Sequence, residues 1–155
     1  MEPARVSGAG LSETLEALLH AAPAFKEQGL NKAPDRGGAY VLAMHLREPL
    51  EILHRGRSHL LEAGSYAYAG SAYGPGGIRA RLRRHFRREK KLHWHVDRLT
   101  VAAEDIRAIA LEGGSECEIV EQLMRSPGFA FPLDGFGSSD CNSCRSHLLQ
   151  WHRQI

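Results

Sequence analysis

The chain has 155 residues, of which 43% are hydrophobic and 25% charged, as expected for one globular domain that buries its own core. The formal net charge of +2 is too small to indicate a partner by itself. Three cysteines, an odd number, argue against a secreted disulfide framework, and no run of about 18 apolar residues could span a membrane. The N-terminus, with Glu2 and Pro3, also lacks the pattern of a signal peptide, so we expect a soluble, cytoplasmic protein.

Residues 1–37 are predicted to form an N-terminal tail, a short helix and a linker ahead of a main domain at residues 38–155. Ser12 is a good N-cap, and an apolar repeat follows it that fits one face of a helix ending near Ala22: Leu15, Leu18 and Leu19. Residues 29–38 are rich in glycine, proline, asparagine and aspartate, which favour turns, so we expect a linker there.

Closely spaced strands open the main domain. Residues 39–46 form a mostly apolar run that predicts a buried strand, and residues 50–53 are expected to be its partner after a turn at residues 48–49. Residues 60–61 and 65–71 supply further strands. Because the connections are too short for helical crossovers, the pattern favours an antiparallel sheet.

Helices are expected after this sheet. A break at residues 74–77, which are three glycines and a proline, precedes one apolar stripe at helical spacing: Ile78, Leu82 and Phe86. Residues 101–111 predict another strand with a bend. We therefore predict an α+β fold, in which a small, mainly three-stranded antiparallel sheet from Tyr40 to Ser71 is flanked by helices.

The C-terminal part begins with a second helix signal. Ser115 and Glu118 have the S-x-x-E spacing of a capping box, which predicts a helix from there to about Arg125. Residues 129–140 resemble a loop, and residues 144–151 are expected to form a last short helix.

The helix after the glycine break is strongly basic. Eight cations stand there against the single acid Glu89: Arg79, Arg81, Arg83, Arg84, Arg87, Arg88, Lys90 and Lys91. Since few acids are available for pairing along the helix, this surface favours binding to nucleic-acid phosphates over a merely solvated face. Arg81, His85 and Arg88 share one line of the helix, which would aim Arg81 and His85 towards the sheet edge. A guanidinium fork suits a phosphate that gains charge during displacement.

Together these segments resemble the GIY-YIG nuclease superfamily. Its name motif is similar to residues 38–40, Gly-Ala-Tyr, and, after a hairpin, to residues 68–70, Tyr-Ala-Gly. The run through Ser71, Arg81 and His85 matches the strand, turn and helix that follow in the family. The branch it most resembles is the Uri-type proteins, small domains sometimes fused to endonuclease III, on segments 66–72, 93–97, 116–118 and 135–141.

The resemblance implies a mechanism. Tyr40 and Tyr68 would flank the scissile phosphate, with one of them positioning or activating the attacking water. Arg81 would stabilise the charge on the phosphate, and His85 would assist proton transfer. Substrate contacts are expected from Arg79, Arg84, Arg88, His95 and Asp97.

One divalent ion, Mg²⁺ or Mn²⁺, would be held by a single glutamate together with water and the phosphate. The family's position for that glutamate falls on Leu123 here. The candidates on the same helix are Glu118 or Glu121, although Glu118 also suits a capping role. Glu116 is interpreted as a first-turn acid.

A second constellation combines His93, His95 and Asp97 with a D-C-x-x-C-x-x-H run at residues 140–147. One interpretation is a structural Zn²⁺ site with Cys141, Cys144, His147 and one of His93 or His95 as ligands. Another has His95 and Asp97 hydrogen-bonded to each other or to a helix end, with both cysteines buried and reduced. In a third, His95, Asp97 and His147 line the active cleft. Cys117 is expected in the core.

The sequence therefore predicts a divalent-metal-dependent endonuclease that hydrolyses phosphodiester bonds in DNA. The alternative is a nucleic-acid-binding domain that does not cleave and acts beside a DNA repair enzyme. A third hypothesis is a zinc-stabilised protein-interaction module whose arginine helix meets an acidic partner.

Overall fold

A five-stranded antiparallel sheet forms the centre of the structure, a computed structural model that describes residues 8–136 and 145–153. Its strands follow one another across the sheet in the order β5 (Asp105–Glu112), β1 (Gly38–Leu46), β4 (Gly64–Ser71), β7 (Leu148–Trp151) and β6 (Phe129–Ala130). A separate two-stranded hairpin is made by β2 (Leu50–His54) and β3 (Arg57–Leu61). The α+β class predicted from the sequence is confirmed, but the sheet is larger than the three strands expected.

Strand β1 runs through the middle of two apolar cores because its side chains alternate between the faces of the sheet. Tyr40, Leu42 and Met44 belong to one core, while Val41 and Ala43 belong to the other. Both sides of β1 are buried, which explains why its sequence is a continuous apolar run.

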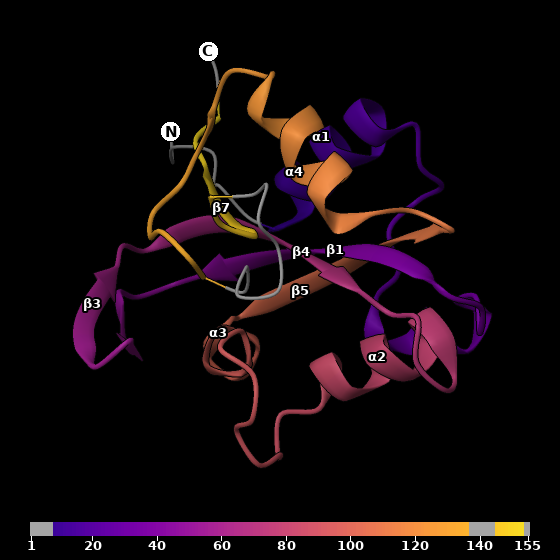
Figure 1. Ribbon diagram of the computed structural model, residues 1–155, viewed down its shortest axis with the longest axis horizontal. Helices are drawn as coiled ribbons and strands as arrows, with labels where there is room; N and C mark the ends of the chain where they lie inside the picture. Colours follow the sequence, from indigo (N-terminus) through magenta and orange to yellow (C-terminus); the bar gives the residue numbers. More distant parts are fainter. Residues whose placement is uncertain (1–7, 137–144, 154–155) are drawn as a thin grey trace, which may run out of the picture.

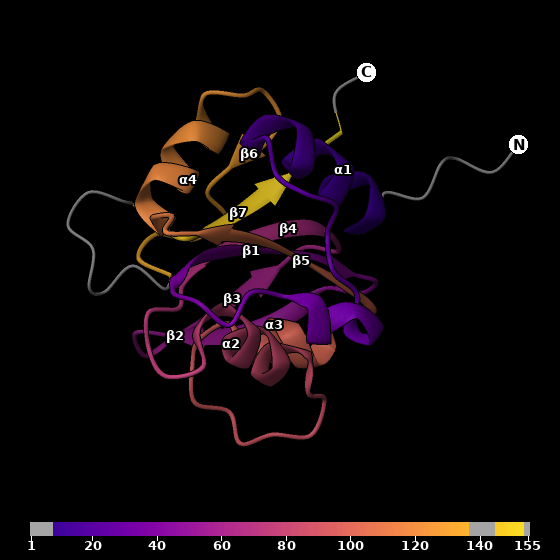
Figure 2. The same ribbon diagram turned by 90° about the vertical axis from the view of Figure 1, so that its right-hand side faces the viewer.

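Helices cover the two faces of the sheet (Figures 1 and 2). Helices α1 (Gly8–Leu19) and α4 (Glu116–Met124) lie on one face, where Leu11 and Leu15 of α1 are fully buried. On the other face lie α2 (Gly77–Phe86), α3 (Asp97–Ala102), the 3₁₀ helix η1 (Glu27–Lys32) and the β2–β3 hairpin. No described helix is long and apolar enough to cross a membrane.

The predicted partner of the first strand is wrong. Residues 50–53 do not pair with β1, because β4 and β5 occupy both of its edges. They pair instead with β3, through the turn at Arg55 and Gly56. The sequence could not show this, since hydrogen bonds between distant strands leave no mark in local hydrophobic periodicity.

Four other boundaries also differ from the prediction. Helix α1 spans Gly8–Leu19, so Ser12 lies inside it and is not its N-cap, and it ends before Ala22. The C-terminal segment expected to be helical contains the strand β7, whose backbone pairs with the free edge of β4. The segment expected to be one bent strand from residue 101 is the end of α3 followed by β5. The predicted linker contains part of η1. Helix α4 starts where the capping box predicted, but the Ser115 side chain makes no capping hydrogen bond.

Candidate functional site

A cavity of about 290 Å³ lies beside the C-terminal end of β4, where β4 no longer pairs with β7. Side chains from six segments line it: Tyr40 of β1, Tyr68 of β4, Arg81 of α2, the segment 93–95 between α2 and α3, Glu116 at the start of α4, and His147 just before β7. The structure thus brings together both tyrosines and the arginine that the sequence singled out.

Gly70 allows Tyr40 to lie across the sheet. The two residues are directly paired between β1 and β4, and a Cβ atom on Gly70 would overlap the Tyr40 ring and hydroxyl. Tyr40 is only 2% exposed, so its ring has no room to move aside. The glycine of the second motif is therefore needed to seat the tyrosine of the first.

The Tyr40 hydroxyl is hydrogen-bonded to His85, with 2.6 Å between Oη and Nε2. Burial lowers the pKa of His85 to about 3, and the neighbouring Lys90 cation acts in the same direction. Burial, with Tyr68 nearby, raises the pKa of Tyr40 far above its usual range. Both groups are therefore neutral at neutral pH, and His85 is a neutral imidazole that holds Tyr40 in place.

The His85 ring also limits the choice of tautomer. Its Nδ1 atom is buried and has no hydrogen-bond partner among the described residues. A buried N–H without a partner is rarer in proteins than a buried acceptor without one. This favours the tautomer in which Nε2–H donates to Tyr40, leaving the Tyr40 O–H to donate towards the cavity.

Tyr68 and Arg81 face the cavity from opposite elements. Burial raises the pKa of Tyr68 to about 12, Glu116 adds to this, and Arg81 opposes it. Within residues 8–136 and 145–153, the Tyr68 hydroxyl makes no hydrogen bond, and Arg81 makes no ion pair. The Arg81 guanidinium lies over the Trp94 ring, 4.3 Å from its centroid. It is thus held in place, and no described carboxylate forms an ion pair with it.

Three of the other arginines predicted to contact phosphate instead bind groups of the protein itself. Arg79 donates to the Ala33 carbonyl, and Arg88 donates to the carbonyls of Thr100, Val101 and Ala103. Arg84 forms a two-point ion pair with Asp97, with N–O distances of 2.7 and 2.8 Å. None of these three arginines lines the cavity.

Asp97 positions the segment that forms one wall of the cavity. Its carboxylate is fully buried and accepts the backbone N–H groups of His93 and Trp94 besides the Arg84 guanidinium. Although burial acts to raise it, these donors hold the pKa of Asp97 well below its usual range. Asp97 therefore acts through the Arg84 side chain and the backbone of residues 93–94, and its carboxylate makes no described hydrogen bond to His95 or to a helix end, while His95 lines the cavity.

The glutamate that lines the cavity is Glu116, which was predicted to be only an acid in the first turn of the helix. Glu118 and Glu121 are exposed and do not line the cavity, and Glu121 pairs with Arg125. Glu116 is the first residue of α4 and follows the turn at residues 113–114, directly after the end of β5. It therefore lies at the end of the strands, where the cavity is. Its place at a strand-to-helix junction was the signal available in the sequence.

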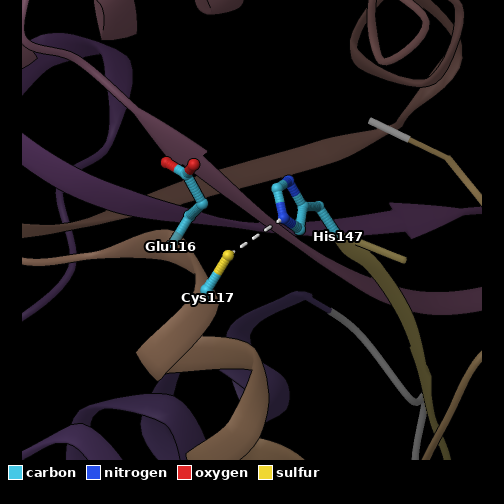
Figure 3. A group of neighbouring side chains, drawn as sticks. All are labelled: Glu116, Cys117 and His147. Atoms are coloured by element: carbon cyan, nitrogen blue, oxygen red, sulfur yellow. Dashed lines mark hydrogen bonds between the residues drawn. The ribbon is translucent and has the colours of Figure 1, made fainter. Parts of the chain in front are cut away.

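Glu116 lies next to Cys117 and His147, as Figure 3 shows. The potential ligand atoms of the three residues lie within 4.8 Å of one another. Cys117 is half-buried and disulfide-bonded, so its expected role as a core thiol is wrong and it offers no thiolate to a metal. Because that sulfur carries no hydrogen, the 3.8 Å contact with His147 is a hydrogen bond donated by Nε2–H.

Part of the predicted zinc site lies outside the described residues, namely Cys141 and Cys144. His147 is buried at the cavity, as one of the three interpretations expected, and His93 and His95 line it too. The disulfide at Cys117 removes one ground on which a reducing compartment was predicted.

The model of one family, described as a domain of unknown function, DUF123, matches residues 39–155. No match was found among curated proteins or solved structures. The matched region contains every residue that lines the cavity.

Proposed function

This chain belongs to the DUF123 family, and we propose that it is a divalent-metal-dependent endonuclease that hydrolyses phosphodiester bonds, with DNA as the favoured substrate. The observation that carries the proposal is the cavity itself, which gathers two tyrosine hydroxyls, an unpaired guanidinium and a carboxylate. Four different elements supply these groups, so no single local motif accounts for their meeting. The resemblance to GIY-YIG nucleases is part of this proposal.

The cavity suits a phosphodiester for reasons of charge. Arg81 presents a cation whose nitrogens match two phosphate oxygens, and its position over Trp94 reduces the entropy lost when it binds. As the phosphorus is attacked, charge rises on these oxygens, and a fixed guanidinium stabilises that charge more than it stabilises the ground state.

The tyrosines act as neutral donors and acceptors. With a pKa of about 12, Tyr68 keeps its proton at neutral pH, so it positions the attacking water by hydrogen bonds instead of serving as an anionic base. Tyr40, fixed by His85, donates its O–H to a phosphate oxygen. His85 is thus a positioning residue for Tyr40.

The residues at the cavity fit a hard divalent cation. Glu116 is half-buried, and its carboxylate oxygens are the kind of ligand that Mg²⁺ and Mn²⁺ prefer, while the adjoining space admits water and phosphate. A cation held by Glu116 would supply charge neutralisation at the phosphate. Glu116 therefore replaces Glu118 and Glu121 as the proposed metal ligand.

The test uses labelled single-stranded, duplex and branched DNA with Mg²⁺, with Mn²⁺ and with EDTA. We expect metal-dependent cleavage that falls at least 100-fold in Arg81→Ala and Glu116→Gln, as losing one charge-stabilising group usually does. Glu118→Gln is the matched control, since it removes the same charge two residues away but outside the cavity, and it should cleave like wild type.

A non-cleaving nucleic-acid-binding domain, acting beside a repair enzyme, is the second candidate. It is favoured by one observation, that the Trp94 ring holds the guanidinium groups of Arg81 and Arg84 at 4.3 and 4.0 Å, so that the cation at the cavity is fixed in place for a phosphate. Salt-sensitive DNA binding without cleavage under any metal would establish this candidate and refute the nuclease.

A further inference from the structure

A second cavity, of about 530 Å³, lies between the β2–β3 hairpin and two further parts of the chain, residues 131–134 and Arg145. We call it the hairpin cavity. Its charged lining is strongly basic among the described residues, with Arg55, Arg57 and Arg145 against the single acid Asp134. Arg145 and Asp134 are paired with each other. Arg55 and Arg57 make no ion pair with any residue of the described ranges, so neither guanidinium group is neutralised by a described carboxylate.

Arg55 occupies a backbone conformation that disfavours it. Its φ is +52° and that of Gly56 is +76°, as in two-residue hairpin turns, where asparagine followed by glycine is the preferred pair. The Arg55 side chain reaches across to Gly135, where an added Cβ would lie 2.7 Å from Nη2. Arg55 thus occupies a turn position that asparagine would fill with less strain.

His54 adds a buried polar group that lacks a partner. It is 4% exposed and lines the same cavity, and neither ring nitrogen has a hydrogen-bond partner in the described part of the chain. Burial lowers the pKa of His54, as do His95, Arg55 and His59 nearby, and the Asp134 backbone, which lies within weak hydrogen-bonding range of the ring, opposes them. Because both nitrogens are shielded from solvent, the ring must turn towards the cavity to gain an oxyanion as its partner.

The two cavities adjoin each other. His95 lines the first and His54 the second, and their ring centroids are 5.0 Å apart. Phe136 lies against both rings and against Tyr68, at 5.6, 5.9 and 6.3 Å. A strand bound in the first cavity would therefore reach the second one past these rings.

We propose that the hairpin cavity binds a backbone phosphate of the same nucleic-acid strand that enters the candidate active site, with Arg55 and Arg57 as its cations and His54 as a hydrogen-bond donor. This rests on the proposed function for the identity of the ligand. The cavity would hold the strand and set its register, while the chemistry takes place in the first cavity.

The test compares wild type with Arg55→Asn and Arg57→Gln. Arg55→Asn places a preferred residue in the turn, so the fold is retained and thermal unfolding should show an unchanged or higher Tm. Binding of a fluorescein-labelled strand of about 12 nucleotides is measured in EDTA at several NaCl concentrations. We expect affinity about tenfold lower in each variant and a salt slope smaller by about one, while Arg125→Gln on α4 matches wild type.

Cleavage measured on the same proteins distinguishes this proposal from the proposed function. Cleavage by wild type, with a higher KM but unchanged kcat in Arg55→Asn, supports both. Wild-type affinity and salt slope in both hairpin variants overturn the phosphate site alone, whether or not DNA is cut. Strand binding that depends on Arg55, without cleavage under any metal, keeps the phosphate site and overturns the nuclease. Absence of strand binding by wild type overturns both.

Discussion

The buried imidazole of His85 makes the stability of the protein depend on pH. Its pKa is about 3 in the folded chain, against an ordinary value of 6.5 in the unfolded chain. Between these values the unfolded chain binds one more proton, so stability is complete above about pH 6.5 and is lost as the pH falls. Each pH unit in that window costs about 1.4 kcal/mol, so lowering the pH to 5 removes about 2 kcal/mol.

The assay is urea unfolding followed by tryptophan fluorescence at pH 7 and pH 5, for wild type and His85→Gln. Glutamine does not titrate and retains a hydrogen-bonding group for Tyr40, and His54 titrates in both proteins, so the difference between them isolates His85. We expect wild type to lose about 2 kcal/mol more than His85→Gln over this interval. Equal losses in the two proteins would refute the neutral, buried state of His85.

Three further predictions follow from the same contacts. Gly70→Ala should cost about 1–3 kcal/mol in chemical denaturation because its methyl group overlaps Tyr40, while Gly74→Ala, with open space around it, should cost less than half as much. Asp97→Asn leaves Arg84 without its buried counter-ion and should cost about 3–5 kcal/mol, a result contradicted by a loss under 1 kcal/mol. Tyr68→Phe should leave the tyrosinate absorbance at about pH 10 unchanged, since the pKa of Tyr68 is about 12.

The strands β1 and β4 and the helix α2 could be predicted from the sequence because their signals are local. A continuous apolar run marks a strand buried on both faces, and Ile78, Leu82 and Phe86 repeat at the helical period. The strand β7 has only four residues, too few to separate a strand from a turn of helix, and its pairing with β4 decides its conformation.

The cations of residues 79–91 show the same limit at the level of single side chains. Helix α2 ends at Phe86, so half of them follow the helix, and the predicted helical line from Arg81 through His85 to Arg88 is wrong. Their number can be counted in the sequence. The sequence does not distinguish an arginine that binds a carbonyl of its own chain from one that can bind a phosphate. Arg79 and Arg88 bind backbone carbonyls, Arg84 binds Asp97, and only Arg81 of the four reaches the cavity.

The sequence by itself determined the α+β class, the apolar faces of β1 and α2, and the two tyrosines and the arginine of the candidate site, because backbone preference and burial are written in local patterns. Only the tertiary structure decided that Glu116 stands beside them and that Glu118 does not. It also decided that His54 and Arg55 form a second basic cavity. These placements depend on which distant segments meet, and such meetings are set by the summed packing and hydrogen bonding of the whole chain.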